Sequence, residues 1–253
     1  MTDDRKQAIA ETFDAVSTTY GVTGPDFFWP LGRALVASAA IGAGERVLDV
    51  ACGTGAVSSA AAEVGGSVTA IDVSPAMVET AKRNGVEAHV MDAEQLRFPD
   101  GSFDHVLCAF AIFFLPDPSR AVREWRRVLQ PGGRLALSVF AGWDPRWRWI
   151  EELTPERLRR PAGTMFDSEN ELEGVLAPAG FEDIRFELAS HELVFADADE
   201  WWAWTWAHGR RGVLSRMTED ELAAYRAGAA ERIAAMSPAV EVFSARFAFA
   251  RKP

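Results

Sequence analysis

Apolar positions along the chain follow two spacings, and their alternation predicts the order of the elements. Short runs of Val, Ile, Leu and Phe indicate buried strands, whereas apolar residues three and four apart indicate helices. The predicted strands are 46–50, 67–72, 86–91, 103–110 and 135–140, then one from 181 and one over 240–250. The predicted helices are 4–17, 25–40, 54–64, 75–83, 118–130 and 168–179, with two more before the last strand.

Strands separated by helices imply right-handed crossovers and a parallel sheet covered on both faces. We therefore expect an α/β fold with a doubly wound, mostly parallel, seven-stranded sheet in a single domain, residues 1–253. Within it, 1–42 form an N-terminal helical cap, 43–140 a ligand-binding core, and 141–253 substrate-side helices and the last strands. Residues 142–165, rich in Trp, Arg and Pro, are predicted to be a lid or crossover insertion.

Turn residues set several of these boundaries. Ser74 before Pro75 and Asp117 before Pro118 each combine an N-cap with a proline at the first helical position. The run 131–133, Pro-Gly-Gly, is predicted to end the second of these helices and to lead into the next strand.

The charge balance argues against nucleic acid as a partner. The chain has 37 acidic and 26 basic residues, a formal net charge of −11, and a phosphate backbone is held mainly by Lys and Arg. The only compact basic run, Arg123, Arg126 and Arg127, has helical spacing and acidic neighbours, and we interpret it as a solvated helix face.

Cysteine content and hydropathy bear on location. Cys52 and Cys108 are too few for a disulfide framework, which suits a reducing cytoplasm. The N-terminus has no apolar signal-peptide core, and the most apolar stretch, 106–115, is too short to span a bilayer. We expect a cytoplasmic protein without a membrane span.

A glycine-rich turn is the strongest functional signal. Residues 47–55, Val-Leu-Asp-Val-Ala-Cys-Gly-Thr-Gly, run from a strand through Gly53 and Gly55 into a helix. Such a turn brings the backbone and free helix N-terminal amides close to a ligand, although it also occurs as a plain strand-to-helix connection. Asp72 ends the next strand, where a carboxylate accepts hydrogen bonds from ribose hydroxyls. Ser58 replaces the third glycine of the dinucleotide fingerprint, which weakens a pyrophosphate interpretation.

Five segments together resemble class I S-adenosylmethionine-dependent methyltransferases. They are 49–55, Asp72, 91–94 (Met-Asp-Ala-Glu), 103–110 (Phe-Asp-His-Val-Leu-Cys-Ala-Phe) and 131–133. The likeness is strongest to the small-molecule branch that includes ubiquinone and menaquinone C-methyltransferases, and it covers about 13–140. It implies a Rossmann-like core. Ala51 stands where the family has the first of three alternate glycines.

The resemblance also implies the cofactor, S-adenosylmethionine, and its contacts. Asp49 would orient the turn and the methionine end, Asp72 would hold the ribose, and Asp92 would lie near the adenine amino group. Tyr20 resembles an aromatic residue that closes over the cofactor, although its usual Asp partner is Gly21 here. The implied cofactor contacts are Tyr20, Asp49, Ala51, Cys52, Gly53, Gly55, Asp72, Val73, Met77, Asp92, Ala93, Glu94, Ala109 and Phe110.

Acceptor-site candidates come from two aromatic segments. Phe113 and Phe114 follow the fourth predicted strand, so they are either core or substrate-facing. On 199–211 the residues Trp201, Trp204, His208 and Arg211 share one helical face. Tryptophans at this spacing are usually core packing. A histidine and an arginine in line with them suit a pocket instead, with His208 as the catalytic base and Arg211 holding an anionic group.

Metal and hydrolase chemistry find little support. The histidines are widely separated and lack zinc or iron ligand spacing; His89 and His105 lie in predicted strands, which favours structural roles. A Gly-x-Ser-x-Gly elbow is absent. We therefore expect no metal ion.

The favoured activity is transfer of a methyl group from a sulfonium to a small-molecule acceptor, chiefly by placement of the two reactants. The resemblance implies an aromatic, natural-product or quinone-like acceptor of secondary metabolism. Nine tryptophans suggest a large, flat or apolar substrate. Two alternatives remain: a cofactor-binding protein of the same fold that does not transfer methyl, such as a cyclase or regulatory module, and a nicotinamide-dependent oxidoreductase. Ser58 and the lack of a Tyr-x-x-x-Lys pair disfavour the oxidoreductase. The pattern does not select O-, N- or C-methylation or an oligomeric state.

Overall fold

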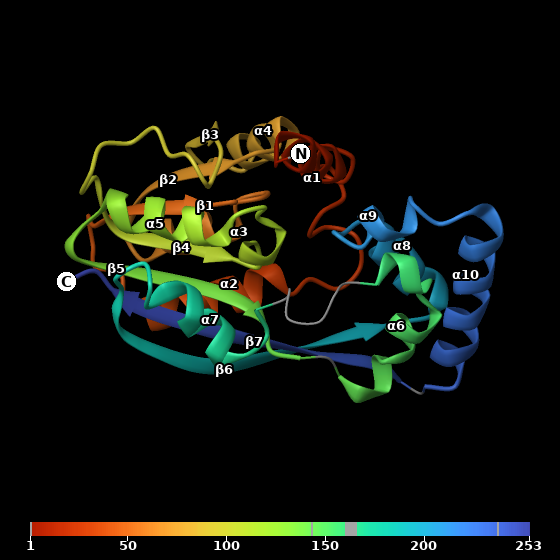
Figure 1. Ribbon diagram of the computed structural model, residues 1–253. Helices are drawn as coiled ribbons and strands as arrows, with labels where there is room; N and C mark the ends of the chain where they lie inside the picture. The colour runs from red at the N-terminus through yellow and green to blue at the C-terminus, as the bar shows by residue number, and fades with distance from the viewer. Residues whose placement is uncertain (1, 143, 160–165, 237) are drawn as a thin grey trace.

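One mixed sheet forms the centre of the computed structural model, which describes residues 2–142, 144–159, 166–236 and 238–253 (Figure 1). Its described strands lie in the order β3-β2-β1-β4-β5-β7-β6. β1 to β5 are parallel, and β7 runs antiparallel to both of its neighbours. This confirms the predicted α/β, mostly parallel, seven-stranded sheet. The strands are β1 (Arg46–Val50), β2 (Ser67–Asp72), β3 (Ala88–Val90), β4 (Phe103–Ala109), β5 (Leu129–Phe140), β6 (Glu182–Phe195) and β7 (Ala239–Arg251).

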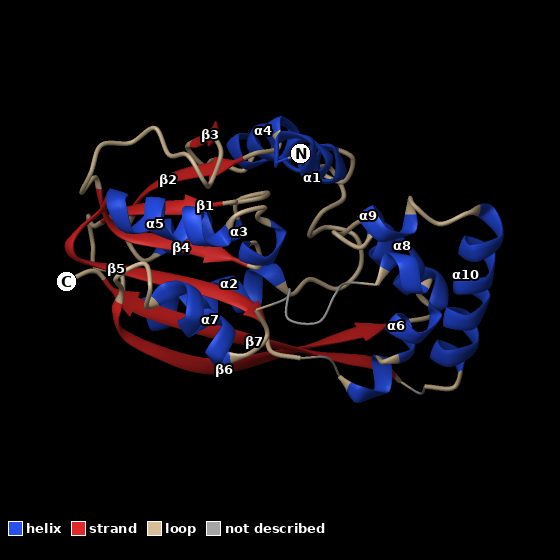
Figure 2. Cartoon of the chain, in the orientation of Figure 1, coloured by secondary structure: helices blue, strands red, loops and turns tan. Residues whose placement is uncertain are grey.

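Helices cover both faces of the sheet. The α5 and α7 helices lie in front of it in Figures 1 and 2, and α2 lies behind. In the described chain three helices, rather than the predicted two, lie between β6 and β7. The helices are α1 (Thr2–Asp14), α2 (Phe28–Ala39), α3 (Ala56–Glu63), α4 (Pro75–Arg83), α5 (Pro118–Val128), α6 (Trp149–Leu153), α7 (Glu169–Leu176), α8 (Ala198–Trp206), α9 (Arg211–Leu214) and α10 (Glu219–Ala234). None of those in the described ranges is long and apolar enough to cross a membrane.

The two predicted N-caps are present. The hydroxyl of Ser74 accepts a hydrogen bond from the Met77 amide at 3.1 Å, and Asp117 accepts one from the Arg120 amide at 2.9 Å. These bonds satisfy amides that have no partner within the first turn of a helix. They fix where α4 and α5 begin.

The predicted end of α5 was wrong. The helix stops at Val128, and Leu129 is already extended and paired with β4. Residues 131–133 lie inside β5, where the register jumps between Leu129 and Arg134. Gly132 has φ +78°, and a Cβ on Gly133 would lie 2.9 Å from the Gln130 carbonyl oxygen. The glycines therefore permit a tight irregularity in a strand instead of terminating a helix.

The last two strands extend past the sheet. Phe140, at the end of β5, pairs with Ala245, whereas β7 begins six residues earlier at Ala239 and pairs there with Phe195 of β6. A two-stranded ribbon therefore projects beyond the carboxyl edge of the parallel strands. In Figure 1 this ribbon reaches toward α6, α8 and α10, which form a helical region separated from the main body of the sheet.

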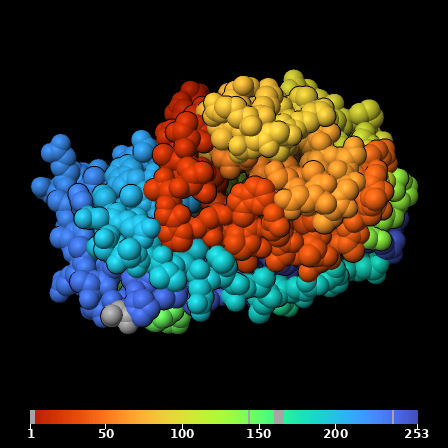
Figure 3. Space-filling model, turned by 180° about the vertical axis from the view of Figure 1, so that it is seen from behind, coloured from red at the N-terminus to blue at the C-terminus, as the bar shows by residue number. Residues whose placement is uncertain are grey.

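The N-terminal segment connects the two parts. Helix α1 contacts α4 on one side and α9 on the other. Asp14, at its end, accepts hydrogen bonds from the Ser74 hydroxyl and the Ala76 amide. Figure 3 shows this red segment lying between the orange and yellow part of the molecule and the light-blue helices.

The predicted lid at 142–165 is only partly described. Its described part contains 3-10 turns at Pro145–Trp147 and Glu156–Leu158 and helix α6. Residue 143 and residues 160–165 lie outside the described residues.

Candidate active site

The glycine turn lies at the carboxyl edge of the sheet, between β1 and α3. Gly53 has φ +54°, and its amide donates to the Asp72 carboxylate at 2.9 Å. The other carboxylate oxygen of Asp72 accepts from the Ser74 amide at 2.9 Å. Asp72 therefore ties the ends of β1 and β2 together, at the point where ligands bind in open α/β sheets. Burial raises the pKa of Asp72, although the backbone donors from Ser74 and Gly53 lower it.

The two glycines of the turn have different surroundings. A Cβ on Gly53 would lie 3.8 Å from Cε1 of Tyr20, in the space that faces the ring. A Cβ on Gly55 would lie 2.8 Å from Cγ2 of Val86, a contact that requires a shift in packing. Gly53 therefore leaves room for a ligand, while Gly55 leaves room for Val86.

Asp49 is buried beneath this turn. The hydroxyl of Ser58 donates to its carboxylate at 2.5 Å. Burial raises the pKa of Asp49 to about 7, and the Asp72 charge adds to this while the Ser58 hydrogen bond opposes it. Ser58, which departs from the dinucleotide fingerprint, thus serves as the partner of the motif aspartate.

A cavity opens between the turn, Asp72 and helix α1. Its wall contains most of the predicted cofactor contacts: Tyr20, Ala51, Gly53, Asp72, Val73, Asp92, Ala93, Glu94, Ala109 and Phe110. Asp49 and Cys52 line an adjoining cavity that shares Tyr20, Gly53 and Phe110 with the first. Gly55 and Met77 are not among the described residues that line either one; Met77 is fully buried on α4.

The predicted adenine end carries a cation from α1. The Nζ atom of Lys6 lies 2.7 Å from the Asp92 carboxylate and 2.5 Å from that of Glu94, whose side chain is buried. Asp92 also accepts from the Glu94 amide at 2.8 Å. Helix α1 is therefore held over this end of the cavity by an ion pair.

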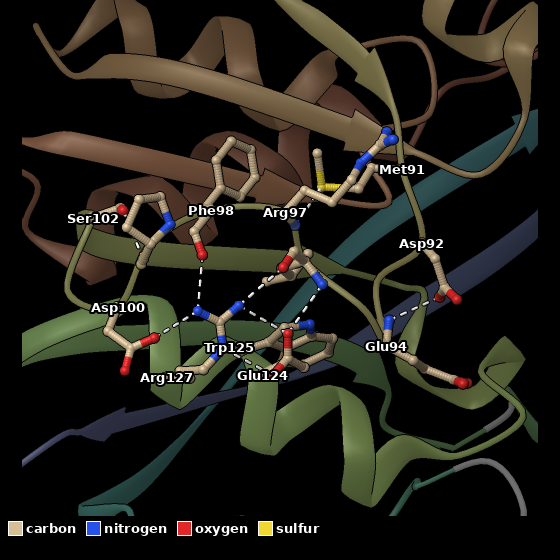
Figure 4. A network of polar contacts seen from close by, with 12 residues as sticks. Met91, Asp92, Glu94, Arg97, Phe98, Asp100, Ser102, Glu124, Trp125 and Arg127 are labelled. Atoms are coloured by element: carbon tan, nitrogen blue, oxygen red, sulfur yellow. Dashed lines mark hydrogen bonds and ion pairs between the residues drawn. The ribbon is translucent and has the colours of Figure 1, made fainter.

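Helix α5 braces the loop that carries Asp92 and Glu94 (Figure 4). Arg127 donates to the carbonyl oxygens of Phe98 and Leu96 and pairs with Asp100. Trp125 donates from Nε1 to the Ala93 carbonyl at 3.1 Å, and Glu124 accepts from the Leu96 amide. The interpretation of the arginine run as a solvated face was thus wrong for Arg127, and Arg126 likewise bonds the Gly180 carbonyl. Only Arg123 of the three is exposed.

A larger chamber of about 330 Å³ lies on the other side of Tyr20 and Phe110. The two chambers share these side chains and Phe114. Phe110 has φ +51°, which is strained for a bulky residue and is typical of functional sites. The aromatic part of the wall is Tyr20, Phe27, Phe28, Phe110, Phe113, Phe114, Phe140, Trp201, Trp204 and Phe243. Phe113 and Phe114 both line the chamber and pack against the core, so the two interpretations of these residues are compatible.

His208 lies in the chamber wall near Tyr20. Its Nδ1 atom is 2.6 Å from the Trp204 carbonyl oxygen, and its ring packs 4.4 Å from Trp204 and 5.3 Å from Tyr20. Its Nε2 atom has no hydrogen-bond partner among the described residues. Burial lowers the pKa of His208 to about 4, so the imidazole is neutral near pH 7. The ring is neutral and its Nε2 lone pair has no partner in the described chain, as a proton acceptor requires, but a pKa of about 4 makes it a weak base near pH 7.

The arginine assignment needs correction. Helix α8 ends at Trp206, and Arg211 begins α9, so the predicted continuous face breaks before it. The Arg211 guanidinium lies over Trp206, at 5.4 Å, and lines an adjoining groove that shares Phe113 and Phe114 with the chamber but not its other described aromatic residues. Its neighbour Arg210 lines the chamber instead, donating to Thr154 at 2.7 Å and to the Ile150 carbonyl.

Among the described polar residues of the chamber wall that the sequence did not predict, Glu241 on β7 is the most deeply buried carboxylate. It is 3% exposed, and its Oε2 atom lacks a hydrogen-bond partner in the described chain. Its signal lay in the strand alternation, since residues 239, 241, 243, 245 and 247 share the buried face of β7. An ionisable residue on the same strand face as Phe243 and Phe247 indicates a cavity or a buried hydrogen-bond partner.

Comparison with known proteins decides the family. Residues 48–137 match the methyltransferase domain model. Nocamycin O-methyltransferase of Saccharothrix syringae is 30% identical over 243 residues, which cover 85% of this chain and 87% of that protein. The chain belongs to the S-adenosylmethionine-dependent methyltransferases.

A second relative of this methyltransferase matches over a shorter stretch. Aklanonic acid methyltransferase DauC of Streptomyces sp. strain C5 is 41% identical over 143 residues, 53% of this chain. The matched part spans 65% of that relative, just under two thirds of its length. Among solved structures, the [4+2]-cyclase SpnF superposes with a TM-score of 0.62 at 21% identity, covering 98% of this chain and 97% of SpnF. That likeness shows the shared fold.

The cofactor of the methyltransferase is S-adenosylmethionine, and the cavity residues fit it. Gly53 leaves open the space that a side chain would fill, and Asp72 presents a carboxylate beside it. Asp92 and Glu94 line the other end of the same cavity.

Proposed function

We propose that the protein methylates a flat, largely apolar small molecule held in the aromatic chamber, with His208 as the base when the acceptor must lose a proton. The observation that carries this proposal is the shared wall of Tyr20 and Phe110. These side chains separate the cofactor cavity from a chamber whose size and aromatic lining suit a small ligand. An acceptor bound in the chamber would therefore reach the cofactor at the wall that Tyr20 and Phe110 form between the two cavities.

When bound, S-adenosylmethionine supplies an electrophilic methyl group at its sulfonium. The side chains of the protein position the cofactor and the acceptor and take up the proton that the acceptor loses. Asp72 would hold the ribose hydroxyls of the bound cofactor. Asp49 stiffens the turn through Ser58, and the aromatic wall orients the acceptor and excludes water. Nε2 of His208 accepts the proton from a hydroxyl while Nδ1 donates to the Trp204 carbonyl.

We further propose that the acceptor is a natural product or a quinone-like intermediate of secondary metabolism. The support is the aromatic chamber, together with two relatives named for aklanonic acid and nocamycin. The whole chain acts as one unit, because the N-terminal cap, the core and the C-terminal helices each contribute to the chamber wall. A cytoplasmic location is consistent with two buried free cysteines.

Calorimetry with S-adenosylhomocysteine and NADH tests the cofactor assignment. We expect micromolar-range affinity for S-adenosylhomocysteine and much weaker binding of NADH, because the Ser58 turn lacks the third glycine of a pyrophosphate site. Comparable NADH binding would contradict the assignment. Conversion of S-adenosylmethionine to S-adenosylhomocysteine in the presence of hydroxylated aromatic compounds then tests methyl transfer, and a cofactor-binding protein without transfer would produce none.

A further inference from the structure

The far end of the chamber holds an unsatisfied carboxyl group. Glu241 is buried, lines the chamber, and has an Oε2 atom without a hydrogen-bond partner among the described residues. Buried polar atoms are almost always hydrogen-bonded, because removing them from water without a partner is costly. A bound ligand is the natural partner for such a group in a cavity wall.

Glu241 lies away from the cofactor. Phe243 is on the same face of β7, about 7 Å along the strand. The Phe243 ring stacks on Phe27 at 4.5 Å and lies 5.7 Å from Phe140, at the end of β5. Glu241 is two residues further from the sheet edge, on the ribbon that projects beyond it. It lines the chamber together with residues of α6 and α8, and it does not line the cavity at the glycine turn.

The nearby cation does not satisfy Glu241. Arg210 donates to Thr154, to the Ile150 carbonyl and to the Tyr225 hydroxyl, and its nearest carboxylate is that of Glu151, at 3.6 Å. Burial raises the pKa of Glu241 to about 8; Asp144 adds to the increase, and Arg210 and Arg146 oppose it. Near neutral pH the group is therefore mostly a carboxylic acid, with one O–H donor and one carbonyl acceptor.

We infer that Glu241 is a specificity-determining residue that binds a hydroxyl or carbonyl group on the acceptor, at the end opposite the atom that receives the methyl group. This inference rests on the proposed function and narrows its substrate class. The acceptor is then a flat molecule with polar groups at both ends, one near His208 and one near Glu241. Aromatic side chains contact the apolar middle.

A matched pair of naphthols tests this inference. 2-Naphthol has one hydroxyl group, and 2,6-dihydroxynaphthalene carries a second at the opposite end of the same ring system. Affinity for each is measured by calorimetry in the presence of S-adenosylhomocysteine. We expect the wild type to bind the diol at least about fivefold more tightly, as for one buried hydrogen bond. A fivefold difference in affinity exceeds the twofold statistical advantage that a symmetric diol gains from its two equivalent binding orientations.

Three variants identify the group responsible. Glu241→Leu should abolish the preference for the diol, while Glu241→Gln, which keeps one donor and one acceptor, should retain most of it. Glu192→Leu, at an exposed glutamate on β6, is the control and should behave as the wild type. Thermal unfolding and S-adenosylhomocysteine affinity show that each variant is folded.

Each result bears on the inference. A preference that survives in Glu241→Leu would overturn it. A glutamine variant as defective as the leucine variant would overturn recognition by a neutral carboxylic acid, since that result indicates that an ionised carboxylate accepts the hydrogen bond from the hydroxyl. A folded wild type that binds S-adenosylhomocysteine but does not prefer the diol overturns the inference and leaves the proposed function standing. Failure of the wild type to bind S-adenosylhomocysteine would instead contradict the proposed function.

Discussion

His208 holds its Nδ1 atom 2.6 Å from the carbonyl oxygen of Trp204, one helical turn earlier in the chain. With Nδ1–H as the donor, the lone pair is on Nε2, the atom that lacks a partner in the described structure. The backbone of α8 thereby sets both the tautomer and the orientation of the ring.

Replacing His208 tests its role as the base. We expect His208→Ala to lower methyl transfer to a hydroxylated acceptor at least about tenfold while S-adenosylhomocysteine affinity stays within about twofold. Because the pKa is about 4, protonation removes the base only as pH falls through 4, so the wild-type rate should not decline through this group above about pH 5. Unchanged transfer, or joint loss of cofactor binding and thermal stability, would make His208 a structural residue.

Substitutions at the two turn glycines should have different consequences. Gly53→Val should abolish S-adenosylhomocysteine binding and leave a folded sheet by circular dichroism, because the side chain enters the cavity facing Tyr20. Gly55→Ala should instead lower the free energy of unfolding by about 1–3 kcal/mol through overpacking and backbone strain. Adding Val86→Ala should recover part of that loss, since the clash is with Cγ2 of Val86. Normal binding by Gly53→Val would show that the turn is not the cofactor site.

Asp72→Asn should weaken S-adenosylhomocysteine binding by about 1–3 kcal/mol, because charge-assisted hydrogen bonds to the ribose are lost. Asparagine has nearly the same shape, but its amide nitrogen cannot accept from Gly53 or Ser74, so a modest loss of stability should accompany the change. Calorimetry on the folded variant measures the effect. Asp104→Asn, at the opposite edge of the sheet beside Arg46, is the control and should bind normally; equal affinities for both variants would refute the role of Asp72.

Ala51→Gly should stabilise the protein. Ala51 has φ +56°, in the left-handed region that disfavours a side chain by about 1–2 kcal/mol, while glycine loses somewhat more entropy on folding. We expect a net increase of about 0.5–1 kcal/mol in the free energy of unfolding by urea denaturation. Ala62→Gly, at an exposed position within α3, is the matched control and should lower it by about 1 kcal/mol. A loss of stability in Ala51→Gly would exclude strain at this position.

The sequence by itself determined the parallel core and its cofactor turn. Strands β1 and β2 and helix α4 have the predicted bounds, because each is set by neighbouring residues: an apolar run, or an N-cap followed by proline. The turn from Asp49 to Gly55 is equally local. Because parallel strands place their carboxyl ends at one edge, the spacing of Asp49 and Asp72 was enough to bring these residues together.

Only the tertiary structure decided the far side of the chamber. Helical spacing aligned Arg211 with His208, but α8 ends at Trp206 and the chain turns, so Arg210 faces the chamber. Likewise, Pro131 and the glycines after it lie in β5, because pairing with β4 begins at Leu129. Glu241 reaches the chamber because β7 extends beyond β5 and returns against β6. Periodicity within one segment describes which residues share a face, whereas the direction of that face depends on contacts between segments far apart in the chain.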